Sequence, residues 1–129
     1  MKKKILVIDD EKGIRDLFRF LLEPQGFDVS TADDGIEGIE MVKKDSFDII
    51  FLDVHMPRMQ GPEALKIIKR LHPDQIVIIF SSSSDPNFTF ESEARELGAY
   101  TCLYKPVDIE DILKVIKKAL KMNGIEYTK

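Results

Sequence analysis

Five short apolar runs alternate with stretches of helical periodicity along this chain, and this alternation restricts the fold more than any other feature. The runs have the length and the β-branched character of strands. They predict strands at residues 4–8, 28–32, 48–53, 76–81 and 101–104. Because parallel neighbours need crossover connections, strict alternation of strands and helices predicts an α/β fold, a doubly wound parallel sheet with helices on both faces.

The stretches between the runs place apolar residues three and four positions apart, as amphipathic helices do. The clearest stripe is ended by Pro24 and Gly26, and it consists of Ile14, Leu17, Phe18, Leu21 and Leu22. Shorter stripes predict three more helices, which would face the core with Ile36, Ile39 and Val42; with Leu65, Ile68 and Leu71; and, over about 87–97, with Phe90, Ala94 and Leu97. Asp108 is placed to cap a last helix by accepting from the N–H of Asp111.

The apolar runs differ in a way that predicts their places in the sheet. Apart from Lys4 and Asp48 at their starts, residues 4–8, 48–52 and 76–80 are continuously apolar, as expected of central strands buried on both faces, whereas 28–32 is mixed and suits an edge. In open parallel sheets the ligand crevice lies beyond the carboxyl ends of the strands. The polar residues that follow each run are therefore the first candidates for a functional site.

Acids, a hydroxyl and a lysine follow the predicted strands, namely Asp9 and Asp10, Asp53, Ser81 and Lys105. Two carboxylates about 4 Å apart repel by roughly 4 kcal/mol at an effective dielectric constant near 20, so three acids need a proton or a cation. An all-oxygen ligand set favours a hard ion, and Mg²⁺ fits because it uses few carboxylates and leaves positions for phosphate oxygens. Since a carboxylate can attack phosphorus, this group of residues suits an aspartyl phosphate.

Composition excludes several other classes of protein. The chain has 129 residues, enough for one domain with its own core, and a net charge of −4 with its basic cluster at 2–4, so direct binding of nucleic acid is not expected. No apolar run approaches the roughly 18 residues of a membrane span, and no export segment is readable. The single cysteine, Cys102, agrees with a reducing compartment, and a cytoplasmic location is expected.

Four motifs, in order and over nearly the whole chain, make this sequence resemble the receiver domain of two-component response regulators. They are IDDE at 8–11, LDVHMPRMQG at 52–61, IIFSS at 78–82 and LYKP at 103–106. RELGAY at 95–100 and KPVDIEDI at 105–112 resemble single-domain phosphorelay receivers of the sporulation type. The resemblance implies a flavodoxin-like fold, (βα)5, with strand order 2-1-3-4-5.

The resemblance also implies a role for each candidate residue. Asp53 would accept a phosphoryl group from a sensor histidine kinase or histidine phosphotransferase, and Lys105 would pair with that group. Asp10, Asp53 and the backbone carbonyl of His55 would bind Mg²⁺, with Asp9 helping through water. Ser81 would be the switch hydroxyl. Such a protein is a signalling domain that catalyses only its own phosphorylation and dephosphorylation, and it acts on a downstream protein target.

Two departures from the family pattern affect the expected switch. The spacing from Ser81 to Lys105 is longer than usual, so Ser83 is a second, less favoured candidate for the hydroxyl. The position where the family usually has an aromatic switch residue is Cys102 here, which leaves the coupled rearrangement of hydroxyl and ring open. The side chain of His55, two positions after the acceptor, could tune the access of water to the phosphate.

The expected organisation is a receiver domain at 1–122 and a C-terminal tail at 123–129, as a monomer or weak dimer without membrane contact. The main alternative is a pseudo-receiver, an interaction module that works without phosphorylation. A flavin-binding protein is disfavoured because DDEKG follows the first strand in place of a loop rich in backbone donors. A haloacid-type phosphohydrolase would need an acid where His55 stands.

Overall fold

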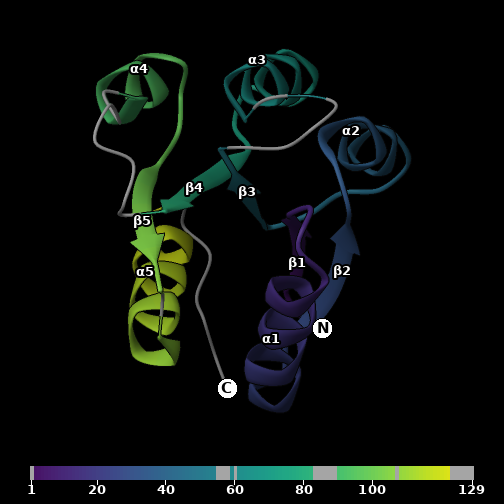
Figure 1. Cartoon of the computed structure of the whole chain (residues 1–129), viewed down its shortest axis with the longest axis vertical. Helices are drawn as coiled ribbons and strands as arrows, with labels where there is room; N and C mark the ends of the chain where they lie inside the picture. The colour runs from purple at the N-terminus through teal and green to yellow at the C-terminus, as the bar shows by residue number, and fades with distance from the viewer. Residues whose placement is uncertain (1, 55–58, 60, 83–89, 107, 123–129) are drawn as a thin grey trace.

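A five-stranded, all-parallel sheet forms the centre of the computed structural model, which describes residues 2–54, 59, 61–82, 90–106 and 108–122. The strand order is β2-β1-β3-β4-β5. Helices α2, α3 and α4 cover one face, and α1 and α5 cover the other (Figure 1). The elements are β1 (Lys4–Ile8), α1 (Lys12–Leu22), the 3-10 turn η1 (Glu23–Gln25), β2 (Asp28–Ala32), α2 (Gly35–Lys44), β3 (Ile49–Asp53), α3 (Gly61–Leu71), β4 (Ile76–Ser82), α4 (Phe90–Glu96), β5 (Thr101–Lys105) and α5 (Ile109–Met122).

The fold class and strand order predicted from the sequence are confirmed. Each strand begins and ends within one residue of its predicted range. The mixed run at 28–32 is an edge strand, and the three continuously apolar runs occupy the centre of the sheet. Asp108 caps α5 as expected, because its Oδ1 accepts from the N–H of Asp111 at 2.9 Å.

Alternate residues of each central strand enter two separate cores. In β1, Leu6 and Ile8 pack toward α2, α3 and α4, whereas Ile5 and Val7 pack toward α1 and α5. On the second side, Phe18 of α1 meets two strands, with ring centroids 5.1 Å from Phe51 and 5.5 Å from Phe80. Burial on both faces explains why the central strands must be apolar throughout.

The predicted helix stripes are wider than the faces that the structure buries. Leu17, Ile36 and Leu71 belong to the predicted apolar stripes, yet they are 38%, 41% and 38% exposed. Leu17 is rotated by about 100° from the buried Phe18 on the α1 cylinder. Ile36 is in the first turn of α2 and Leu71 is the last residue of α3, where neighbours are missing on one side.

The fourth helix was predicted over about 87–97, and α4 covers Phe90–Glu96 of that range. Residues 87–89 lie outside the described residues, as does the tail predicted at 123–129. Ala94 is buried, and Leu97, just after the helix, packs against the same core. Across the ranges that the structure describes, no helix combines the length and the apolar character that a membrane span requires.

The carboxyl end of β3 is held in place by the start of α3. Gly61 donates its N–H to the carbonyl of Val54 at 2.8 Å. A Cβ atom at Gly61 would lie 2.8 Å from the carbonyl oxygen of Asp53 and 2.8 Å from the Cα of Val54, which is closer than such atoms can approach. A glycine is therefore required for the helix to begin this close to the strand end that carries Asp53.

We expect Gly61→Ala to destabilise the protein by about 1–3 kcal/mol, because backbone atoms on the end of β3 would have to move. Gly13→Ala is the matched control, since Gly13 lies in α1 and a Cβ there would meet nothing within 4 Å. It should be neutral or stabilise by up to about 1 kcal/mol, as alanine does in helices. Urea unfolding of both variants measures the difference, and equal stabilities would contradict this account of Gly61.

Candidate functional site

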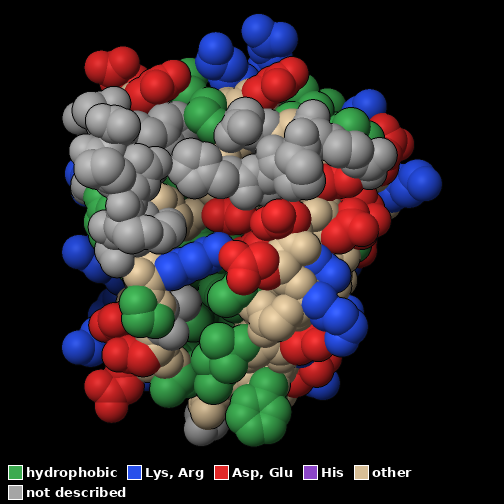
Figure 2. Space-filling model, in the orientation of Figure 1, with side chains coloured by type: hydrophobic (Ala, Val, Ile, Leu, Met, Phe, Trp, Pro, Cys, Tyr) green, Lys and Arg blue, Asp and Glu red, His purple; other side chains and the backbone are tan. Residues whose placement is uncertain are grey.

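Three carboxylates meet at the carboxyl ends of β1 and β3. One oxygen each of Asp9, Asp10 and Asp53 lies within 4.8 Å of the others. The side chains differ in environment, because Asp9 and Asp53 are only 0% and 4% exposed whereas Asp10 is exposed to solvent. Figure 2 shows acidic side chains gathered in the middle of one face of the molecule, beside a basic side chain. We call Asp9, Asp10 and Asp53 the acid cluster.

The sheet positions the two buried acids through its backbone ladder. Asp9 follows β1 directly, and its N–H continues the pairing with β2 by donating to the carbonyl of Ala32 at 3.1 Å. Asp53 is the last residue of β3 and pairs in register with Phe80 of β4. The N–H of Val54 then donates to the carbonyl of Phe80 at 3.1 Å, which extends the ladder past the acid. Both carboxylates are thus carried by backbone that the sheet holds on at least one side.

Lys105, the last residue of β5, reaches across β4 to the acid cluster. Its Nζ lies 3.2 Å from Oδ2 of Asp9, 3.5 Å from Oε1 of Glu11 and 3.6 Å from Oδ1 of Asp53. It also lies 5.2 Å from the centre of the Phe80 ring. Burial opposes the charged form of this lysine, but the carboxylates of Asp53, Asp9 and Glu11 together outweigh it and raise the pKa of Lys105 above its ordinary value.

Asp9 is the most constrained member of the acid cluster. Its Oδ1 accepts from the N–H of Glu11 at 2.8 Å, whereas Oδ2 is buried and faces the Lys105 ammonium at 3.2 Å without the geometry of a hydrogen bond. Burial raises the pKa of the Asp9 carboxyl, although the N–H of Glu11 and the ammonium of Lys105 act in the opposite direction. A buried carboxylate oxygen whose described contact is an ion pair can accept a metal cation in place of the ammonium.

Four of the predicted site residues are brought together, namely Asp9, Asp10, Asp53 and Lys105. Ser81 is fully buried near the end of β4 and pairs in register with Tyr104, the residue before Lys105. His55 and Ser83, the other predicted site residues, lie outside the described residues. Cys102 is half-buried and packs against the core beneath α2, α3 and α4. The roles of these residues in phosphorylation and switching stay predictions.

Two side chains near the acid cluster were not predicted from the sequence. Glu11 contributes both its carboxylate to Lys105 and its N–H to Asp9. Arg15 donates from Nη1 to the backbone carbonyl of Asp9 at 2.8 Å. The signal that could have found them is their position at the N-cap and in the first turn of a helix that follows two of the acids, because the start of such a helix must lie against the strand end.

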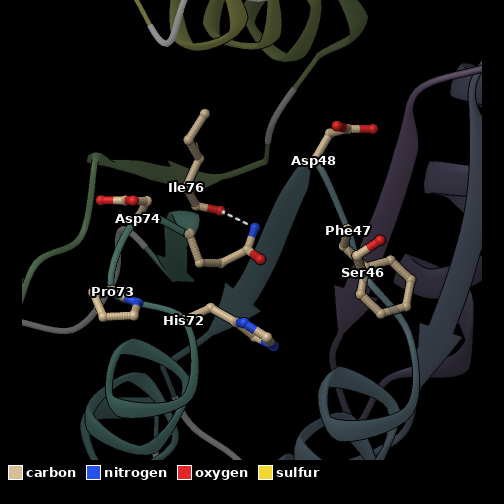
Figure 3. Close-up of a pocket in the computed structure, with 8 residues that line it drawn as sticks. Ser46, Phe47, Asp48, His72, Pro73, Asp74 and Ile76 are labelled. Atoms are coloured by element: carbon tan, nitrogen blue, oxygen red, sulfur yellow. Dashed lines mark hydrogen bonds between the residues drawn. The ribbon is translucent and has the colours of Figure 1, made fainter.

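A hollow at the other end of the sheet is separate from the acid cluster. Its volume is about 310 Å³, and Figure 3 shows its lining, which comes from the segments before β3 and β4: Ser46, Phe47, Asp48, His72, Pro73, Asp74, Gln75 and Ile76. Asp48 immediately precedes β3, and Asp53 ends it. The full length of this strand therefore separates the hollow from the acid cluster.

In metal-free protein we expect Asp9→Asn to be more stable than the wild type at neutral pH. The raised pKa means that the folded state binds a proton at Asp9 more tightly than the unfolded chain does. The stabilisation from that proton is complete below the ordinary value of 3.8 and is lost as the pH rises through the folded-state pKa. Thermal unfolding in EDTA should show a difference that is largest at neutral pH and shrinks in acid.

Asp16→Asn is the control, because the pKa of Asp16 is shifted in the direction opposite to that of Asp9. Asp16 is exposed, and its pKa is lowered by the Lys12 ammonium, which donates to it at 2.6 Å. The ionised Asp16 contributes to the stability of the folded state above pH 3.8, the ordinary pKa of the group, and this contribution is lost as the pH falls through the lower folded-state pKa. This variant should therefore gain no stability at neutral pH. A metal-free Asp9→Asn protein that is less stable than the wild type at neutral pH would contradict the account of Asp9.

Comparison with known proteins gives a consistent result. The family model described as "Response regulator receiver domain" matches residues 5–117. The chain is 35% identical over 124 residues to sporulation initiation phosphotransferase F of Bacillus subtilis (strain 168), covering 96% of this chain and 98% of that protein.

Solved structures agree with the family match. The chemotaxis protein CheY4 of Vibrio cholerae is similar with a TM-score of 0.85 and 30% identity, covering 93% of this chain and 100% of that one. A response regulator receiver domain protein from Clostridium thermocellum is similar with a TM-score of 0.87 and 35% identity, covering 95% and 97%. The fold, the acid cluster and these matches together show that the chain belongs to the response regulator receiver family of two-component signalling.

Proposed function

We propose that this receiver domain accepts a phosphoryl group on Asp53 in a Mg²⁺-dependent reaction. The observation that carries the proposal is the burial of Asp53 next to two further carboxylates and within 3.6 Å of the Lys105 ammonium. A nearby ammonium favours the ionised form of a buried acid, and an ionised carboxylate can act as a nucleophile.

Mg²⁺ fits the residues present at the site. All the donors are oxygens, which a hard divalent ion prefers. The buried Oδ2 of Asp9 forms an ion pair with Lys105 at 3.2 Å but no hydrogen bond among the described residues. Asp10 and Asp53 would hold the ion directly, with Asp9 acting through water and the backbone carbonyl of His55 as a further ligand. When bound, the ion would neutralise charge on the oxygens of the transferring phosphoryl group.

The transfer is a displacement at phosphorus. A carboxylate oxygen of Asp53 forms a bond to phosphorus while the bond to the imidazole nitrogen of a phosphohistidine breaks, and the released imidazole takes up a proton from water. Lys105 is already ionised and within a short movement of Asp53, so its ammonium can pair with the phosphoryl oxygens as they arrive. Burial of Asp53 limits the routes by which water could attack the acyl phosphate afterwards.

The output of the reaction is a change of the surface around β4, α4 and β5. Ser81 is proposed as the switch hydroxyl, since it is buried one strand away from Asp53 and lies in register beside Tyr104 of β5. A hydroxyl that turned toward the phosphoryl group would move the end of β4, and β5 is paired to that end. A protein partner would then recognise one of two surface states.

A place in a phosphorelay is supported by the relative from Bacillus subtilis, which is named a phosphotransferase and matches over 98% of its length. We propose that the donor is a sensor histidine kinase or a histidine phosphotransferase, and that the phosphoryl group is either passed on to a further histidine or sensed by a downstream protein.

Incubation with acetyl phosphate or phosphoramidate and Mg²⁺ should add one phosphoryl group to the wild type and none to Asp53→Asn, as measured by intact mass. Asp48→Asn is the matched control, because Asp48 is the same residue type at the amino end of the same strand. It should be phosphorylated like the wild type. EDTA should abolish the reaction in both proteins.

A wild-type chain that binds Mg²⁺ and yet stays unmodified would contradict the proposal. An affinity for the partner that changes neither with Mg²⁺ nor in Asp53→Asn would instead favour the pseudo-receiver, an interaction module that works without phosphorylation.

The two possible outputs, transfer of the phosphoryl group to another protein and binding of a partner without transfer, give different products. They can be told apart by adding protein that carries a labelled phosphoryl group to a lysate of the cells from which it comes. In a relay, label should move to a second chain as a phosphohistidine, which is labile in acid and stable in base. Loss of the label only as inorganic phosphate, together with binding of a second chain, would indicate stand-alone output. The Asp48→Asn variant, phosphorylated in the same way, is the control and should behave like the wild type in both respects.

A further inference from the structure

The backbone carbonyl of Asp9 needs a donor that the sheet does not provide. The pairing of β1 with both of its neighbours ends at Ile8, which lies opposite Ala32 of β2 and Leu52 of β3. The next peptide is already part of the turn that presents Asp9 and Asp10. Buried carbonyl groups are nearly always paired, so the partner of this one helps to define the shape of the turn.

Arg15 is that partner. Its Nη1 donates to the Asp9 carbonyl oxygen at 2.8 Å, and its own backbone N–H donates to the carbonyl of Glu11 at 3.2 Å. The side chain is half-buried. Together with the bond from the Asp9 N–H to Ala32 and the bond from the Glu11 N–H to Oδ1 of Asp9, this contact holds the turn at its backbone and at its side chain.

The position of this guanidinium is costly unless something nearby attracts it. Arg15 is the fourth residue of α1, and a cation near the amino end of a helix opposes the helix dipole. The N-cap residue, Glu11, makes no side-chain capping bond that would offset this. The bond from Nη1 to the Asp9 carbonyl at 2.8 Å is the described contact that offsets this cost.

The choice of acceptor matters for metal binding. Lys105 contacts the carboxylates themselves, and those contacts compete with a metal ion. Arg15 is bound to a backbone carbonyl, so it fixes the turn and occupies no carboxylate oxygen. Residues that orient metal-binding side chains without contacting the metal ion typically account for about 10–100-fold in metal affinity.

We infer that Arg15 is a positioning residue for Mg²⁺. It holds the Asp9–Asp10 turn so that the carboxylates of both residues lie next to that of Asp53. This inference rests on the proposed function, since it assigns Arg15 to the metal site of that reaction. On this inference, removing Arg15 weakens the binding of Mg²⁺. Simple electrostatics predicts the opposite, because removing a positive charge near a cation site should strengthen cation binding.

The test is calorimetric titration of Mg²⁺ into metal-free protein, which needs no phosphorylation. We expect Arg15→Gln to weaken Mg²⁺ binding about tenfold or more. Arg19→Gln is the matched control, since Arg19 is one turn further along α1 and contacts only Thr31 and Glu23, at 3.5 and 3.6 Å, among its described polar partners. It removes the same charge and should bind Mg²⁺ at least as well as the wild type.

Arg15→Met is measured beside Arg15→Gln because it keeps the aliphatic stem and loses the donors. Similar weakening in both variants supports the inference, and wild-type affinity in either one overturns it. Equal weakening in Arg15→Gln and Arg19→Gln also overturns it, since that result would reflect α1 as a whole.

Hydrogen exchange in EDTA separates this inference from the proposed function. The Glu11 amide donates to Oδ1 of Asp9, so it should exchange faster in Arg15→Gln than in Arg19→Gln if Arg15 holds the turn. Equal exchange would overturn the positioning role. A wild-type protein that binds no Mg²⁺ would contradict the proposed function and, with it, the assignment of Arg15 to the metal site. Wild-type Mg²⁺ binding that Arg15→Gln leaves unchanged would overturn the inference alone.

Discussion

The contact between the Lys105 ammonium and the buried carboxylates of Asp9 and Asp53 is the interaction on which the rest of this structure depends. Two acids that are 0% and 4% exposed at the ends of neighbouring strands would destabilise the fold if nothing compensated their charge. Lys105 lies 3.2 and 3.6 Å from them and arrives from β5, which is separated from β3 by β4. The strand order therefore decides whether the acids are tolerated.

The surroundings of these three residues are built to keep them in place. Two apolar cores clamp the central strands from both faces, so the strand ends cannot shift to relieve repulsion. Gly61 lets α3 start directly against the end of β3, and Arg15 reaches back from α1 to the turn after β1. The result is a rigid arrangement of oxygens that one lysine only partly neutralises. This arrangement is the basis for our proposal that the site accepts a divalent cation and a phosphoryl group.

Much of the fold could be predicted because its signals are local. The continuous apolar runs gave the central strands, the mixed run at 28–32 gave an edge strand, and the polar residue after each run marked the candidate site. The exposure of Leu17, Ile36 and Leu71 could not be predicted in this way, because helical periodicity identifies an apolar face but not how much of it another element covers. Glu11 and Arg15 were missed for a related reason, since their importance comes from a backbone turn and a lysine far away in the chain.

The amino-acid sequence by itself determined which chemical groups are present and at which strand ends they stand. Strand alternation and apolar runs follow from the order of residues. They place Asp9, Asp53, Ser81 and Lys105 at the carboxyl ends of the strands of a parallel sheet. Only the tertiary structure decided the distances between these groups, which of the acids are buried and which carbonyl Arg15 binds. Burial and ion pairing depend on how separate segments pack together, and that packing supplies the low-dielectric surroundings in which a few charges decide what the site can bind.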